Sequence, residues 1–134
     1  MTEAKHNTDA LRRRIRSFVR REGRLTAGQQ KALETLWLRY GLSIEHELKL
    51  TELFGRSAPV TLEIGFGNGA SLAEMAEKEP DSDFIGIDVH RPGVGHLLKK
   101  LEEQGLDNVR VFCHDAVEIL ERNIPDAGLH RVLL

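Results

Sequence analysis

The fold is decided by the run Val60-Thr61-Leu62-Glu63-Ile64-Gly65-Phe66-Gly67-Asn68-Gly69. Residues 60–64 are mostly apolar and partly β-branched, which indicates a strand. The glycines that follow it allow a tight turn and a close approach of the backbone to a ligand. Residues 70–79 then carry apolar side chains at helical spacing, and Pro80 ends that helix. A strand, a glycine-rich turn and a helix in this order indicate the start of a β-α-β unit.

The same alternation continues to the end of the chain. Further strands are predicted at 83–88, 109–113 and 129–134. Two helices are predicted between them, marked by Val94, Leu97, Leu98 and Leu101 and by Val117, Leu120 and Ile124. Alternating strands and helices predict an α/β fold with a parallel sheet and right-handed crossovers, the first half of a doubly wound domain spanning 59–134. Because the last strand is an apolar edge with no helix after it, we expect a truncated domain whose edge pairs with a missing half or a second copy.

Residues 25–58 precede this unit and are predicted to form a helical extension. Thr26 and Gln29 have the spacing of a capping box, and apolar residues at helical spacing follow as far as Gly41. One further helical turn is expected at 50–54, and residues 56–59 have the composition of a linker.

Residues 1–24 form an arginine-rich arm. They hold eight basic residues against three acidic ones, a net charge of +5, whereas the other 110 residues carry eleven basic and eighteen acidic ones. Guanidinium groups bind phosphate in two-pronged fashion, so this arm is suited to a phosphate backbone. A mobile tail that only aids solubility is the alternative. If the arm binds phosphate groups, deleting it should weaken RNA binding at low salt.

The composition excludes several classes of protein. Of the 134 residues, 40% are hydrophobic and 30% are charged, as in soluble globular proteins. No apolar run is long enough for a membrane span or a signal peptide, and the single cysteine, Cys113, cannot form an internal disulfide. We therefore expect a cytoplasmic protein with no membrane partner. The six histidines have no metal-ligand spacing, and Cys113 is expected to be a buried apolar residue.

Three features lie where ligands bind in such sheets, at the carboxyl ends of the predicted strands. The first is the glycine loop, with Gly65, Gly67 and Gly69. The second is Asp88, whose carboxylate can accept both hydroxyl groups of a ribose. The third is Asp115, which can accept from an adenine amino group, cap the following helix, or do both.

The glycine loop alone leaves the cofactor open. Gly65-x-Gly67-x-x-Ala70 also fits a dinucleotide-binding fingerprint. Glu63 favours S-adenosylmethionine, because a carboxylate attracts its cationic end and would repel a pyrophosphate. The alternative for Glu63 is an acidic residue at a strand end with no role in binding.

Five stretches together resemble the bacterial tRNA (guanine-N7-)-methyltransferase family. They are residues 14–26, 29–34, 62–72, 86–95 and 113–118. The resemblance covers about residues 11–134. It is carried most specifically by the arginine-rich entry, the Glu-Ile-Gly-Phe-Gly run and the His-Arg-Pro-Gly-Val-Gly run.

The resemblance implies a methyltransferase domain of Rossmann-like type with S-adenosylmethionine as cofactor. It implies cofactor contacts from Glu63, Asp88, Asp115 and the loop Gly65–Gly69, and methyl transfer to N7 of a guanine in the variable region of tRNA. It also implies that the arm helps hold tRNA, and the arginines concerned are Arg16, Arg20, Arg21 and Arg24.

The chain departs from the family in one respect. The Phe-Phe-Pro-Asp-Pro-Trp-type segment that follows the fourth strand in such enzymes, with its acidic site residue, is not in this sequence. Guanine N7 carries a free lone pair, so the transfer needs positioning more than a base. We therefore expect no catalytic residue within these 134 residues.

Two other functions stay open. One is a nicotinamide-dependent oxidoreductase built on the same half-fold, and the other is a non-catalytic RNA-binding fragment acting through the arm alone. Binding of S-adenosylmethionine, of a dinucleotide, or of neither separates the three hypotheses.

Overall fold

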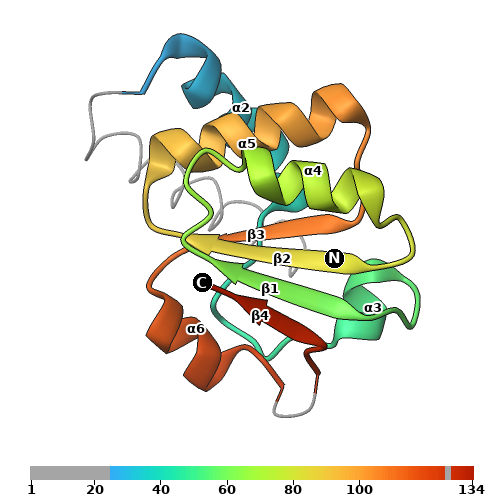
Figure 1. The fold of residues 1–134 in the computed structure, drawn as a ribbon. Helices are drawn as coiled ribbons and strands as arrows, with labels where there is room; N and C mark the ends of the chain where they lie inside the picture. The colour runs from blue at the N-terminus through green and yellow to red at the C-terminus, as the bar shows by residue number, and fades with distance from the viewer. Residues whose placement is uncertain (1–24, 126–127) are drawn as a thin grey trace, which may run out of the picture.

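The computed structural model describes residues 25–125 and 128–134 (Figure 1). Its centre is a four-stranded sheet with the order β3-β2-β1-β4, in which every neighbouring pair is parallel. The strands are β1 (Val60–Ile64), β2 (Asp83–Asp88), β3 (Val109–Cys113) and β4 (Arg131–Leu133). The predicted parallel α/β architecture is confirmed. The arginines assigned to tRNA binding lie outside the described residues.

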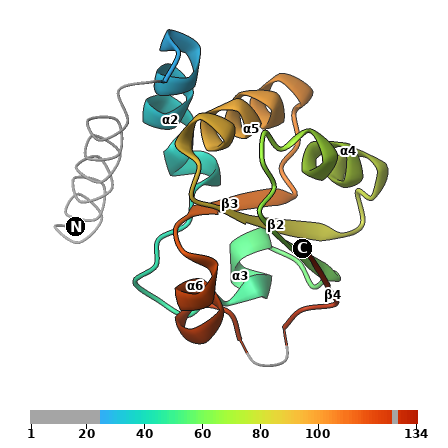
Figure 2. The same ribbon diagram turned by 60° about the vertical axis from the view of Figure 1, so that its left-hand side comes forward.

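Helices cover both faces of the sheet (Figures 1 and 2). One face carries α2 (Ala27–Tyr40), α4 (Ala70–Lys78) and α5 (Arg91–Gln104). The other face carries α3 (Leu50–Phe54) and α6 (Ala116–Arg122). Because side chains alternate along a strand, each strand contributes to both layers: Phe84 packs into the α2–α4–α5 core, and its neighbour Ile85 packs into the core beneath α3 and α6.

The helical extension is joined to the edge of β3. The predicted capping box is present, since the Gln29 N–H donates to Thr26 Oγ1 over 3.1 Å and the Thr26 N–H donates to Gln29 Oε1 over 3.1 Å. At the other end of α2, the Leu42 N–H donates to the Val111 carbonyl over 2.8 Å, so the chain leaving the helix extends the sheet by one bridge. Gly41 is required there because a Cβ would lie 2.2 Å from the Trp37 ring. Trp37 is buried, in agreement with a packing role.

Two details near the C-terminal end differ from the prediction. Val117 and Leu120 are exposed, by 62% and 40%, whereas Ile119 is fully buried. Because α6 has only seven residues, its apolar side chains can be grouped in two ways that both fit helical spacing. Periodicity alone therefore did not decide which group packs against the sheet. The last strand is also shorter than predicted: β4 covers three residues, and residues 129–130 approach the sheet with one bond, from the His130 N–H to the Val60 carbonyl.

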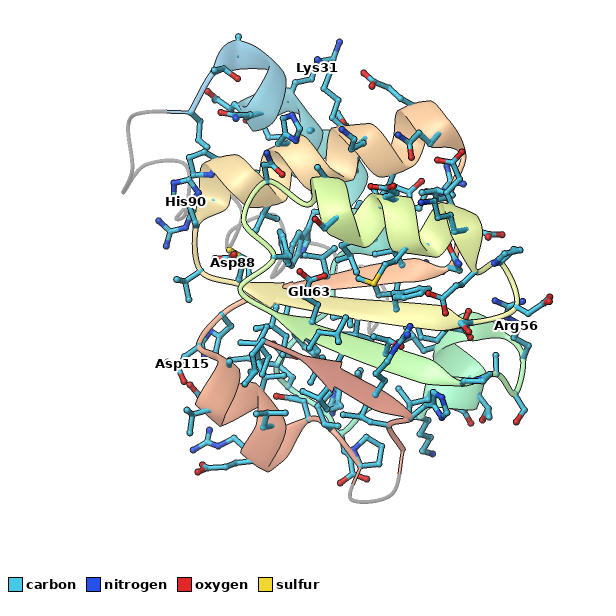
Figure 3. All side chains as sticks on the ribbon, in the orientation of Figure 1. Lys31, Arg56, Glu63, Asp88, His90 and Asp115 are labelled. Carbon is cyan, nitrogen blue, oxygen red and sulfur yellow. The ribbon has the colours of Figure 1, made fainter. Side chains whose placement is uncertain are left out.

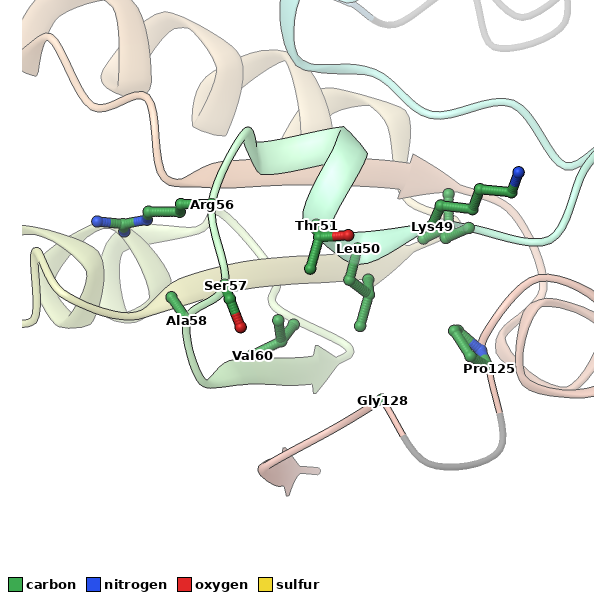
Figure 4. A pocket seen from close by; sticks show the side chains of 10 residues that line it. Lys49, Leu50, Thr51, Arg56, Ser57, Ala58, Val60, Pro125 and Gly128 are labelled. Atoms are coloured by element: carbon green, nitrogen blue, oxygen red, sulfur yellow. The ribbon is translucent and has the colours of Figure 1, made fainter.

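The amino end of the sheet holds a charged anchor and a cavity. The guanidinium of Arg56 lies 2.7 Å from Oδ1 of buried Asp83 and donates to the carbonyls of Pro80 and Ser82. A cavity of about 380 Å³ opens nearby, with Leu50, Val60 and Pro125 among its lining residues (Figure 4). This end is remote from the glycine loop.

None of the helices among the described residues has the length and apolar character to span a membrane.

Candidate functional site

The predicted ligand residues gather at the carboxyl ends of β1, β2 and β3. The glycine loop joins β1 to α4, Asp88 is the last residue of β2, and Asp115 follows β3. Figure 3 places Asp88, His90 and Asp115 along the side toward which the strands point, with Glu63 further back on β1. The expected clustering at one edge of the sheet is therefore present.

The three loop glycines share a positive φ but differ in what a side chain at each position would contact. All have positive φ, of 76° at Gly65, 66° at Gly67 and 81° at Gly69, which strains any other residue. A Cβ on Gly69 would lie 2.6 Å from Leu97, so this glycine allows the loop to pack on α5. A Cβ on Gly65 or Gly67 would meet nothing within 4 Å. These two glycines therefore border open space, where a ligand can approach the backbone.

Asp88 fixes the loop to the end of β2. Its Oδ2 accepts from the Gly67 N–H over 2.9 Å, and its Oδ1 accepts from the His90 N–H over 3.0 Å. Each carboxylate oxygen has a second lone pair, so both can also accept from ligand hydroxyl groups. Asp88 therefore combines a structural role, which sequence reasoning did not assign, with the geometry needed for the predicted ribose contact.

The start of α5 is packed tightly against the loop. A Cβ on Gly93 would lie 2.1 Å from the Gly67 carbonyl oxygen, and a Cβ on Gly95 would lie 2.9 Å from the Gln29 carbonyl oxygen. The first glycine allows α5 to support the loop, and the second allows α2 to pack on α5. The sequence signal for this close packing is the Gly-x-Gly spacing of residues 93–95, which in the sequence indicated only a family resemblance.

One carboxylate oxygen of the Glu63 side chain is buried. Its Oε2 accepts no hydrogen bond within the part of the chain that the structure describes. Burial raises the pKa of the Glu63 carboxyl above its usual value. In the register of the sheet it lies between Gly86 of β2 and Leu133 of β4. A buried carboxylate oxygen without a partner is costly unless a cation or a hydrogen-bond donor approaches it.

Glu63→Gln is expected to stabilise the ligand-free chain at pH 7 by about 1 kcal/mol, because it removes the cost of burying an unpaired charge. Because the folded-state pKa is raised, this cost is absent below the ordinary pKa of a glutamate, grows as the pH rises from there to the raised pKa, and is constant above it. Urea unfolding at pH 7 and pH 4 would measure the difference.

Glu45→Gln serves as the control for this measurement, since Glu45 is exposed in a loop and should leave the free energy of unfolding unchanged. A Glu63→Gln chain that is less stable than the unsubstituted chain at pH 7 would contradict the prediction.

Asp115 is the N-cap of α6, where its Oδ1 accepts from the Glu118 N–H over 3.2 Å. Its capping role is confirmed, and its contact with adenine stays a prediction. Two exposed apolar side chains lie close in sequence to these acids. Val89, 61% exposed, directly follows Asp88 and was not singled out from the sequence; Val117, 62% exposed, lies two residues after Asp115 and was expected to be buried.

Comparison with known proteins finds methyltransferases similar to this chain. Residues 57–134 match the family model described as "Putative methyltransferase". The chain is 59% identical over 134 residues to a tRNA (guanine-N(7)-)-methyltransferase of Methylococcus capsulatus, covering all of this chain and 58% of that protein. It is 58% identical over 123 residues to the protein of the same name from Escherichia coli, covering 91% of this chain and 52% of that protein. The chain thus spans about half the length of the curated relatives it matches.

Partial matches among solved structures include one described as that of an antibiotic related methyltransferase. It is 28% identical to this chain, with a TM-score of 0.47, and the match covers 57% of this chain and 38% of that one. A second is PKMT2 from Rickettsia typhi in complex with AdoHcy, at 26% identity and a TM-score of 0.37, covering 54% of this chain and 16% of that one.

Proposed function

We propose a reaction on the premise that this chain belongs to the "Putative methyltransferase" family. Its protein transfers a methyl group from S-adenosylmethionine to N7 of a guanine in the variable region of tRNA. In this proposal the 134 residues bind the cofactor. The names of relatives that are about 60% identical to the chain support the reaction and the substrate. The family resemblance noted in the sequence supports the guanine position.

One observation carries the choice of cofactor: a buried carboxylate oxygen of Glu63 without a hydrogen-bond donor among the described residues. When bound, S-adenosylmethionine supplies an electrophilic methyl group on a cationic sulfonium. A positive charge near Glu63 would compensate its buried carboxylate, whereas a pyrophosphate would add a second negative charge. This disfavours the nicotinamide-dependent alternative.

The other residues of the site would orient the cofactor. Gly65 and Gly67 leave room for it against the backbone, and Asp88 accepts from the ribose hydroxyls while it holds the loop. Val89 and Val117, close in sequence to Asp88 and Asp115, offer exposed apolar surface to the cofactor. Asp115 accepts from the adenine amino group and continues to cap α6. With the cofactor held in this way, guanine N7 needs mainly alignment for transfer.

The tRNA would be held partly by the arginine-rich arm, with contacts from Arg16, Arg20, Arg21 and Arg24. This follows from the charge of residues 1–24 and from the names of the relatives.

We also propose a cytoplasmic location. The outer edge of β4, where Val132 is half exposed, is proposed to pair with a further strand or a second copy.

Two measurements test the proposal. Calorimetric titration of the chain should detect binding of S-adenosylmethionine and no binding of NAD; the reverse would favour an oxidoreductase. A chimera should then join residues 1–134 to the remaining C-terminal part of the Methylococcus capsulatus relative. Nucleoside analysis of tRNA treated with this chimera should show N7-methylguanosine, and a chimera that binds cofactor and tRNA without methylating guanine would contradict the proposed reaction.

A further inference from the structure

The exposed face formed by α2 and α5 carries a group of basic residues that the cofactor site does not use. Along α5, the basic residues come first and the acidic ones last: Arg91, His96, Lys99 and Lys100 precede Glu102 and Glu103. The first turn of α5 contains no acidic residue, and Lys99 and Lys100 lie in the second half of the helix.

Two lysines from different helices lie on one surface. The Nζ of Lys99 is 3.8 Å from the position that a Cβ on Gly28 would occupy, so this side chain lies along the start of α2. Gly28 and Lys31 are three residues apart and therefore share a face of α2. Lys31 and Lys99 are both exposed, and Figure 3 shows Lys31 on the outer side of this helical layer.

This surface leads directly to the glycine loop. His96 lies one helical turn before Lys99, and its Nδ1 is 2.9 Å from the carbonyl oxygen of Asn68. We use the term basic row for Lys31, Lys99 and His96. One end of the basic row is thus a neighbour of Gly67, whose backbone borders the proposed cofactor position.

The two lysines of the basic row are not neutralised within the described part of the chain. No ion pair there involves Lys31 or Lys99. Two nearby acids have other partners: Glu34 accepts from Gln30, and Glu102 accepts from Arg39 and Tyr40. Glu103, four residues after Lys99, is in no ion pair within the described residues. An anionic partner could therefore contact both lysines without displacing an existing ion pair.

We propose that the basic row binds phosphate groups of the RNA substrate and so positions the strand beside the glycine loop. This inference rests on the proposed function. In the sequence, the arm reaches as far as Arg24, four residues before Gly28, so the positive charge of the arm continues onto α2. Phosphate contacts of this kind fix the position of RNA and carry no sequence specificity.

The test compares two double substitutions of equal charge. Lys31→Gln with Lys99→Gln removes the two lysines of the basic row. Lys49→Gln with Lys78→Gln removes two exposed lysines outside the basic row: Lys49 lines the cavity in Figure 4, and Lys78 pairs with Glu74 at the end of α4. Binding of a tRNA transcript to the chain would be measured by fluorescence anisotropy across a series of salt concentrations, and binding of S-adenosylmethionine by calorimetry.

The basic-row variant should bind tRNA about tenfold more weakly at low salt, and its log–log salt slope should fall by about two. The control variant should stay within about twofold of the unsubstituted chain. Equal losses in both variants, or none in the basic-row variant, would overturn the inference and leave the proposed methyl transfer intact. An unsubstituted chain that binds S-adenosylmethionine but no tRNA would overturn the inference too, while failure to bind the cofactor counts against the proposed function.

Discussion

Gly93→Ala is expected to abolish detectable binding of S-adenosylmethionine and to lower the free energy of unfolding by about 2 kcal/mol. The added Cβ would lie 2.1 Å from the carbonyl oxygen of Gly67, and a backbone atom cannot move aside as the end of a side chain can. Either α5 or the loop must shift. Because Gly67 borders the proposed cofactor position, a shift of the loop changes the site directly.

Gly28→Ala is the matched control, since it makes the same change in another helix. Its Cβ would meet only the mobile end of Lys99, at 3.8 Å, so the substitution should stabilise α2 by about 1 kcal/mol and leave cofactor binding unchanged. Thermal unfolding and calorimetry of the two variants would settle the point. A Gly93→Ala chain that binds S-adenosylmethionine normally would show that the packing of α5 against the loop does not shape the site.

Asp88→Ala should weaken S-adenosylmethionine binding by at least about 100-fold, equivalent to about 2.7 kcal/mol. The substitution removes the proposed acceptor of the ribose hydroxyls and the two bonds that hold Gly67 and His90. Calorimetric titration measures the loss of affinity. Urea unfolding should show a smaller loss of stability, of about 1–2 kcal/mol, because water can replace part of these exposed bonds.

Asp88→Asn separates the two roles of this side chain. An amide oxygen can still accept one backbone N–H, but the amide nitrogen cannot accept, so stability should partly return while affinity stays low. Asp81→Ala, at the opposite end of β2, controls for the loss of a negative charge. If Asp88→Asn binds the cofactor as tightly as the unsubstituted chain, the ribose contact is wrong.

The sequence was sufficient for the sheet because its signals were local and redundant. The bounds of β1, β2 and β3 match the predicted ranges, since each strand is a short, mostly apolar run bounded by turn or polar residues. The capping box of α2 was predicted for a similar reason: both partners lie within four residues of each other. The parallel arrangement followed from the alternation of strands and helices.

The contacts within the site could not be predicted in the same way. That Asp88 holds Gly67 depends on two residues 21 positions apart, and that Gly93 lies against Gly67 depends on how α5 packs. The absence of a donor for Glu63 among the described residues is likewise a property of the folded environment. The sequence predicted which residue types meet at the carboxyl edge, and the three-dimensional packing determines what each of them does there.

The bridge between the end of α2 and β3 has a consequence for the order in which the chain folds during synthesis. Leu42 donates to Val111, and α2 packs on α5, so the partners of the helical extension are made long after it. The ribosome must release the chain as far as α5 and β3 before α2 can bury its apolar side. Until then the extension, with Trp37 and Tyr40 uncovered, is a natural target for chaperones that recognise apolar segments of nascent chains.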